Sequence, residues 1–218
     1  IQGGMGAGVS NWFLAKTVSK LGHLGVVSGT ALDTIMARRL QLGDPGNHIR
    51  RALEHFPVPE IAQRIYNKYF ISGGKKADQS FKPVSMFNLR PNRSLLELTV
   101  VANFVEVFLA KEGHEGLVGI NFLEKIQLPN LASLYGAMLA GVDYVLIGAG
   151  IPQEIPGVLD KFSNHDEASL RVHVDSENPV SNHKMSFNPK EVLGMIPGRL
   201  KRPKFLAIIS SLILAKSL

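Results

Sequence analysis

Residues 118–150 read VGINFLEKIQLPNLASLYGAMLAGVDYVLIGAG, and this stretch decides the fold class. Short apolar runs at 118–121 and 144–147 enclose a segment from about Asn130 to Gly141 in which apolar residues recur at helical spacing. A buried strand, a helix and a second buried strand in this order predict a β/α/β unit with parallel strands. We therefore expect a parallel sheet that alternates with helices.

The same alternation extends in both directions from this unit. The expected strands are Ile1–Gln2, Gly25–Ser28, Val84–Phe87, Val118–Asn121, Tyr144–Ile147 and Phe205–Ile209. A chain with six such strands and no dinucleotide fingerprint favours a TIM (β/α)8 barrel over an open doubly wound sheet. Because a complete barrel takes about 250 residues and the chain has 218, we expect an α/β barrel that is truncated after about six strands.

Helices are expected between these strands. One begins after Ser10 as its N-cap, and another follows Ser94 and ends near Gly113. The side chains expected on the inner face of the first helix are Phe13, Leu14, Val18 and Leu21. We expect each helix to return the chain to the next parallel strand.

Two regions interrupt the alternation. Residues 33–76 carry helical patterns cut by Asp44-Pro45-Gly46 and Pro57-Val58-Pro59, which predicts a helical insertion. Residues 161–202 are polar and predict an irregular excursion. We expect a single partial barrel domain over residues 1–218, with both regions outside the barrel wall.

Composition excludes several classes of site. The chain has no cysteine, so disulfides, thiolate zinc sites and cysteine nucleophiles are excluded, and a reducing, cytoplasmic compartment is favoured. None of the seven histidines has the spacing of a metal site, so no metal is expected. An organic cofactor is therefore the expected source of reactivity.

Charge and hydropathy argue against two classes of partner. The net charge of +6 is dispersed and aromatic residues make up only 7% of the chain, which does not favour nucleic-acid binding. No apolar run reaches the roughly 18 residues that a membrane span needs. We expect neither a nucleic-acid partner nor a membrane partner.

Glycines and small polar residues follow several of the strands. Gly3-Gly4-Met5-Gly6 lies between the first strand and the first helix, Gly148-Ala149-Gly150 follows the fifth strand, and Ser210 follows the sixth. Glycines at such places let backbone N–H groups approach a flat or anionic ligand, and a helix start adds partial positive charge. Ordinary tight turns explain any one of these segments, but their recurrence at several strand ends favours room for a cofactor.

Asn121 ends the fourth expected strand, where its amide could contact the polar edge of a ring. Asn88, after the third strand, competes for this role. Glu124 and Lys125 follow Asn121, and both are expected to be solvated or paired with each other. Asn121 is therefore the favoured ligand contact among these polar residues.

These segments together resemble the nitronate monooxygenase (2-nitropropane dioxygenase) family of flavin enzymes. The similar segments are Gln2–Gly6, Leu24–Gly29, Gly119–Asn121, Gly148–Pro152 and Phe205–Ser211. The insertion and the stretch from Val118 to Pro156 look closer to a subgroup that includes the trans-acting enoyl reductases of polyunsaturated fatty acid and polyketide synthases.

The resemblance implies a TIM barrel with a non-covalent FMN at its carboxyl-terminal mouth. The cofactor-binding residues that it implies are Gly3, Gly4, Met5, Gly6, Asn121, Gly148, Gly150 and Ser210. The family's catalytic histidine lies on a later strand, so its counterpart is expected beyond Leu218 and no catalytic residue is assigned here.

Three functions remain open at this point. The first is an FMN-dependent oxidoreductase that oxidises alkyl nitronates and passes electrons to O2. The second is an NAD(P)H-dependent enoyl reductase that acts on the double bond of an acyl thioester through the same flavin. The third is a non-catalytic fragment without flavin, whose exposed strand edges would favour aggregation or a homo-oligomer.

Overall fold

The computed structural model describes residues 1–173 and 183–217 of the chain. Its centre is a parallel four-stranded sheet of β1 (Gly25–Ser28), β2 (Val118–Leu123), β3 (Tyr144–Gly148) and β6 (Lys204–Ala207). The strands lie side by side in this order, so their spatial order follows the chain without a reversal. The protein is therefore an α/β protein, as predicted.

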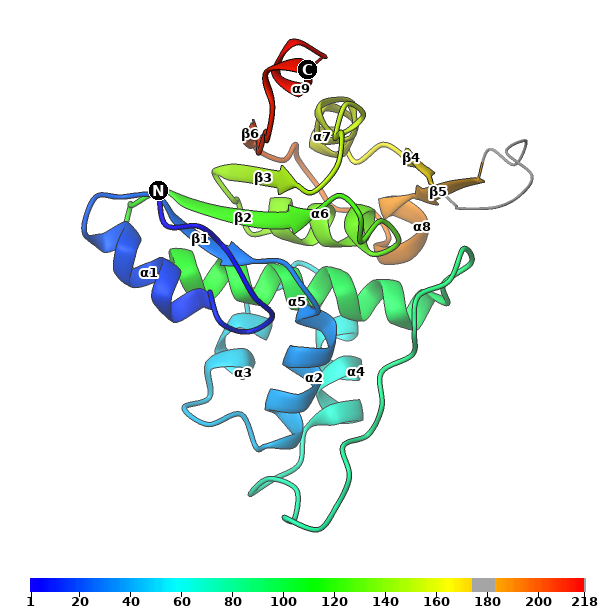
Figure 1. Cartoon of the computed structure of the whole chain (residues 1–218). Coiled ribbons are helices and arrows are strands. Elements are labelled where there is room, and N and C mark those ends of the chain that lie inside the picture. Colours follow the sequence, from blue (N-terminus) through cyan, green and yellow to red (C-terminus); the bar gives the residue numbers. More distant parts are fainter. Residues whose placement is uncertain (174–182, 218) are drawn as a thin grey trace.

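Helices fill the connections between these strands (Figure 1). The helices around the sheet are α1 (Trp12–Lys20), α5 (Arg93–Lys111), α6 (Asn130–Leu139), α7 (Ile155–Ser163) and α9 (Leu212–Ser217). Between β1 and α5 the chain forms α2 (Leu32–Gln41), α3 (His48–Leu53) and α4 (Pro59–Tyr69). These three pack on the side of α5 away from the sheet, so the helices predicted over residues 33–76 are confirmed.

One hydrophobic core extends from the sheet across helices α5 and α6 to the inserted helices α2, α3 and α4. Its strand residues alternate along each strand, as the two-residue period of a strand requires, and each is at most 3% exposed: Val27, Ile120, Phe122, Val145 and Ile147. Burying a side chain of this size contributes about 1.5–3 kcal/mol. Helix α5 is apolar on nearly all sides because it is enclosed between the sheet and the inserted helices.

The inner face predicted for α1 is wrong. Ala15 and Ser19 are its buried residues, whereas the large apolar side chains expected inside are 38–72% exposed at Phe13, Leu14 and Leu21. The reason is the close approach of α1 to β1, since a Cβ on Gly25 would lie 2.0 Å from the carbonyl oxygen of Ala15. Only small side chains fit into such a contact.

Two predicted strands are not strands in the structure. Residues 84–87 form an extended loop in which Met86 is 90% exposed. No place exists for them in the sheet because β1 pairs directly with β2. Residues 1–2 do lie beside β1, where the backbone N–H of Gln2 donates to the Leu24 carbonyl at 3.0 Å, but this contact does not extend into a ladder of strand pairs.

The region 161–202 is more regular than expected where the structure describes it. Strands β4 (Ala168–Val172) and β5 (His183–Phe187) form a separate antiparallel pair, followed by α8 (Pro189–Leu193). Residues 174–182 of the predicted excursion lie outside the described residues. None of the helices in the described ranges is long and apolar enough to span a membrane.

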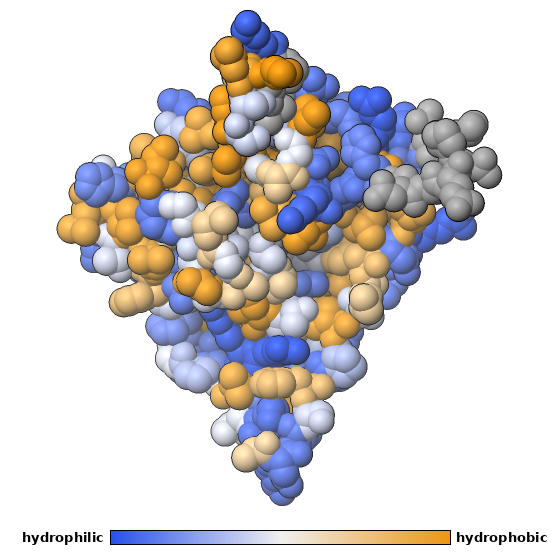
Figure 2. All heavy atoms as spheres, in the orientation of Figure 1, coloured by the Kyte–Doolittle hydropathy of each residue, from blue (hydrophilic) through white to orange (hydrophobic). Residues whose placement is uncertain are grey.

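Exposed apolar side chains gather near both edge strands of the sheet, as the orange atoms of Figure 2 show at the N-terminal segment and at the C-terminal projection. On the β1 side these are Ile1, Met5, Val9 and Phe13, and beyond β6 they are Ile208, Ile209, Leu212 and Ile213. Patches of this kind are typical of surfaces that other protein groups cover.

Candidate functional site

The candidate site lies along the carboxyl edge of the parallel sheet, where all four strands end. Two residues next to this edge have left-handed backbone angles without being glycine: Ala31 (φ 56°) after β1 and Ala149 (φ 59°) after β3. Such conformations cost about 1 kcal/mol or more each and cluster at functional sites in proteins. The backbone is therefore strained shortly after β1 and directly after β3.

Asn121 is the least satisfied polar residue of this edge. It lies on β2 opposite Ser28 of β1 and is only 4% exposed. Its Nδ2 donates to the Gly4 carbonyl at 2.9 Å and lies 3.5 Å from the Met5 sulfur. Its Oδ1 is buried and has no hydrogen-bond partner within the described ranges. An unpaired buried acceptor costs about 1–3 kcal/mol, so a bound donor would stabilise this side chain.

The glycine-rich segment at residues 3–8 folds back onto β1. The Ser10 hydroxyl donates to the Gly3 carbonyl at 3.1 Å and accepts from the Met5 N–H at 3.0 Å. A Cβ on Gly4 would lie 2.5 Å from the Val27 carbonyl oxygen, so the protein's own packing accounts for this glycine. The segment carries Met5 to Asn121, and the Met5 side chain remains 60% exposed there.

The start of α1 is occupied by protein groups. Asn11, rather than the expected Ser10, caps the helix by accepting from the Leu14 N–H at 3.1 Å. The Trp12 N–H donates to a carboxylate oxygen of Glu106 at 2.7 Å. Burial raises the pKa of Glu106, although Arg39 at 2.9 Å partly opposes this. These contacts leave little of the helix start for an anionic ligand.

Gly148 and Gly150 form a second cluster at the same edge, around Glu124. The Glu124 N–H donates to the Gly148 carbonyl at 2.8 Å, and a Cβ on Gly150 would overlap the Glu124 carboxylate. Ser210 is exposed beyond the end of β6. The structure thus joins Gly3, Gly4, Met5 and Asn121 through hydrogen bonds, places Gly148 and Gly150 on the neighbouring strand end, and leaves Gly6 and Ser210 exposed.

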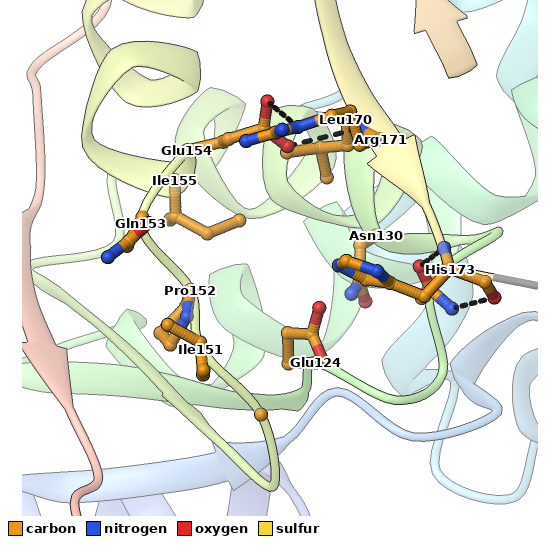
Figure 3. Close-up of a pocket in the computed structure, with 12 residues that line it drawn as sticks. Glu124, Asn130, Ile151, Pro152, Gln153, Glu154, Ile155, Leu170, Arg171 and His173 are labelled. Carbon is orange, nitrogen blue, oxygen red and sulfur yellow. Dashed lines mark hydrogen bonds and ion pairs between the residues drawn. The ribbon is translucent and has the colours of Figure 1, made fainter. Parts of the chain in front are cut away.

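A cavity of about 390 Å³, here called the outer cavity, opens beside this second cluster. Figure 3 shows Glu124 pointing into it, facing Ile151 and Pro152 on one side and His173 on the other. Its volume falls in the range of small-molecule sites. Apolar side chains form much of its wall: Ile151, Pro152, Ile155 and Leu170.

Polar pairs hold the rim of the outer cavity in place. The Gln127 side chain binds the backbone of His173 twice, accepting from its N–H at 2.7 Å and donating to its carbonyl at 3.1 Å. Arg171 pairs with the Glu154 carboxylate at 3.3 Å (Figure 3). These contacts connect β4 and the residue that follows it to the loops after β2 and β3.

Sequence reasoning missed the place of Glu124 and His173. It expected Glu124 to be solvated or paired with Lys125; Glu124 is half-buried and lines the outer cavity, and no ion pair joins it to Lys125 in the described part of the chain. The available signal was Gly150, because a residue without Cβ leaves room for a neighbouring side chain. His173 directly follows β4, in a region that the sequence predicted to be an irregular excursion.

Comparisons with known proteins do not assign the chain to a family. No family model, no curated protein and no solved structure matches this chain. Within the described ranges, no group of three or more His, Asp or Glu side chains is arranged to hold a metal ion. The function therefore has to be argued from the chemistry of the carboxyl edge itself.

Proposed function

We propose that the chain is an FMN-dependent oxidoreductase that resembles the nitronate monooxygenases, with the flavin bound at the carboxyl edge of the sheet. The observation that carries this proposal is Asn121, whose buried Oδ1 has no partner among the described residues. A flat ring with an N–H donor at its edge would satisfy this acceptor. Ligands bind at the same edge in parallel α/β proteins generally.

The sheet supports the proposal that these strands form part of a (β/α)8-barrel wall. The strand order β1-β2-β3-β6 follows the chain, whereas a doubly wound sheet reverses direction at a switch point. The Gln2 N–H bonds to Leu24 beside β1, on the side away from β2 in this order. Barrel closure would bring further strands to the sheet edges where the exposed apolar side chains gather.

The residues present fit the ring of FMN better than its phosphate. Asn121 would orient the ring, and Met5, exposed beside it, would shield the ring from water. The start of α1 is engaged by Asn11 and Glu106, so the phosphate would be held elsewhere. When bound, FMN would supply the ability to accept and pass on electrons.

We place the substrate in the outer cavity. Its apolar wall suits an alkyl chain, and the Glu124 carboxylate and His173 imidazole could exchange protons with a bound molecule. The same wall favours the second candidate, an enoyl reductase, because it would also suit the acyl chain of a thioester. The two candidates differ in the reductant of the flavin, which is an alkyl nitronate in one and NAD(P)H in the other.

Anaerobic reduction of the FMN-loaded protein tests the proposal. Bleaching of the flavin absorbance by an alkyl nitronate, but not by NADPH, is the expected result. Bleaching by NADPH together with turnover of an enoyl thioester would establish the second candidate instead. If FMN does not bind, the third function, a non-catalytic and self-associating protein, stands, and sedimentation would then show oligomers.

A further inference from the structure

A second and smaller cavity of about 160 Å³, here called the inner cavity, lies on the helix side of the sheet. It is lined by the ends of β1 and β2, the start of α2, and helices α5 and α6. Asn130 at the start of α6 lines both cavities and donates from its Nδ2 to the Leu123 carbonyl at 3.3 Å. The function proposed above does not use the inner cavity.

Asn103 is the feature of the inner cavity that packing does not explain. It lies in the middle of α5, is 1% exposed, and lines the cavity with Thr99 one turn before it. Its Nδ2 donates to the Thr99 carbonyl at 2.9 Å, but its buried Oδ1 has no partner in the described part of the chain. A leucine would fill such a place in an apolar helix without leaving an unpaired acceptor.

Other polar groups of the wall are largely engaged. The Thr99 hydroxyl donates to the Leu95 carbonyl at 2.8 Å, and the Asp33 carboxyl accepts from the Thr34 N–H at 2.7 Å. Much of the remaining wall is apolar: Leu32, Phe87, Phe122, Leu123 and Ile126. The inner cavity therefore combines a partly apolar wall with the buried Oδ1 of Asn103, which has no partner among the described residues.

We propose that the inner cavity binds a small neutral molecule, about the size of a six-membered ring, that donates one hydrogen bond to Asn103. The size follows from the volume, since an engineered apolar cavity of about 150 Å³ binds benzene. The donor follows from Asn103 Oδ1, which accepts and cannot donate. A hydroxyl or amide on an apolar ring has both properties.

Calorimetric titration with phenol, anisole and toluene tests this proposal on the unmodified protein. These probes share a ring, but only phenol donates a hydrogen bond. Phenol is expected to bind about tenfold more tightly than either of the others, which corresponds to one hydrogen bond to an otherwise unpaired acceptor. Equal affinities for all three, or no phenol binding at millimolar concentration because water fills the cavity, would overturn the proposal.

Two variants locate the binding. Asn103→Leu removes the acceptor and is expected to abolish the preference for phenol over toluene. The control is Ser163→Ala, which removes a buried helical hydroxyl outside this cavity. This hydroxyl donates to the Leu159 carbonyl, so its loss should leave phenol affinity unchanged. A preference for phenol that survives in Asn103→Leu would contradict the assignment to Asn103. The comparison of probes on the unmodified protein remains decisive if this variant fails to fold.

Discussion

The two ends of the parallel sheet differ in how completely their polar groups are paired. At the amino end, the buried Asp143 carboxylate accepts from Lys111, from Lys201 at 2.9 Å and from the Val118 N–H at 3.0 Å. Nearby, the Ser19 hydroxyl donates to the Leu117 carbonyl at 2.6 Å. Both side chains bind backbone groups of the β2 segment, so this end is closed and fully engaged.

At the carboxyl end of the same strands, the described residues include a buried polar atom without a hydrogen-bond partner, and they line two cavities. Asn121 has an Oδ1 without a partner among the described residues, Ala31 and Ala149 have left-handed backbone angles, and both cavities open there. The polar contacts at the amino end stabilise the fold, whereas the carboxyl end has an unpaired buried acceptor, backbone strain and cavities among the described residues. This division is general among barrels of parallel strands.

The largest effect is expected from adding a methyl group at the closed end. Gly25→Ala would place its Cβ 2.0 Å from the Ala15 carbonyl and 2.6 Å from the Ser19 hydroxyl, so α1 must separate from β1. We expect a loss of about 3 kcal/mol or more in the free energy of unfolding, measured in urea. Gly3→Ala at the open end is the matched control, because its nearest neighbour would be Met5 Cγ at 3.7 Å. Equal losses in the two variants would show that the amino end is not packed more tightly than the carboxyl end.

A smaller effect is expected when Asp143 loses its charge. Burial alone would raise the pKa of Asp143, but hydrogen bonds from Lys111, Lys201 and Val118 lower it below its ordinary value. A lowered pKa stabilises the folded state above the unfolded pKa of about 3.9, and the contribution is lost as the pH falls through the folded value. Asp143→Asn should therefore cost about 2 kcal/mol at neutral pH.

Urea unfolding of wild type and Asp143→Asn between neutral and acid pH measures this effect. The difference between the two proteins should be constant at neutral pH and shrink as the pH falls below about 4. A difference that persists unchanged into strong acid would show that the carboxylate charge does not stabilise the closed end.

The arrangement of the sheet was largely predictable, whereas the packing of α1 was not. Apolar runs at 25–28, 118–121, 144–147 and 205–209 predicted the four strands because buried parallel strands are apolar on both faces. The inner face of α1 was wrong since the pattern favours large apolar side chains, while contact with Gly25 requires small ones. Such a requirement depends on the distance between two elements, which no single segment encodes.

The sequence predicted that the candidate site lies at the carboxyl ends of the strands, but not which residues contact one another there. Asn121 was predicted as a ligand contact from its position at a strand end, and within the described ranges its buried Oδ1 has no hydrogen-bond partner. Asn103 was not found, because a single Asn within a helical pattern carries no signal of a cavity. The place of His173 in the cavity wall was also missed, since it depends on hydrogen bonds to the Gln127 side chain, which lies 46 residues earlier in the sequence.

The smallest effect on stability is expected at Asn121. Asn121→Leu removes the hydrogen bond to the Gly4 carbonyl together with the unpaired Oδ1, so gain and loss partly offset each other. We expect the free energy of unfolding to change by less than about 1 kcal/mol, again measured in urea. A loss as large as that of Asp143→Asn would indicate that Asn121 serves the fold rather than a ligand.

Titration of FMN into wild type, Asn121→Leu and Asp143→Asn, followed by flavin fluorescence, tests most directly whether the carboxyl edge is the ligand site. Wild type and Asp143→Asn should bind FMN with equal affinity, and Asn121→Leu should bind it about tenfold more weakly because one buried hydrogen bond is lost. Absence of FMN binding to wild type, or equal affinity in Asn121→Leu, would contradict this assignment.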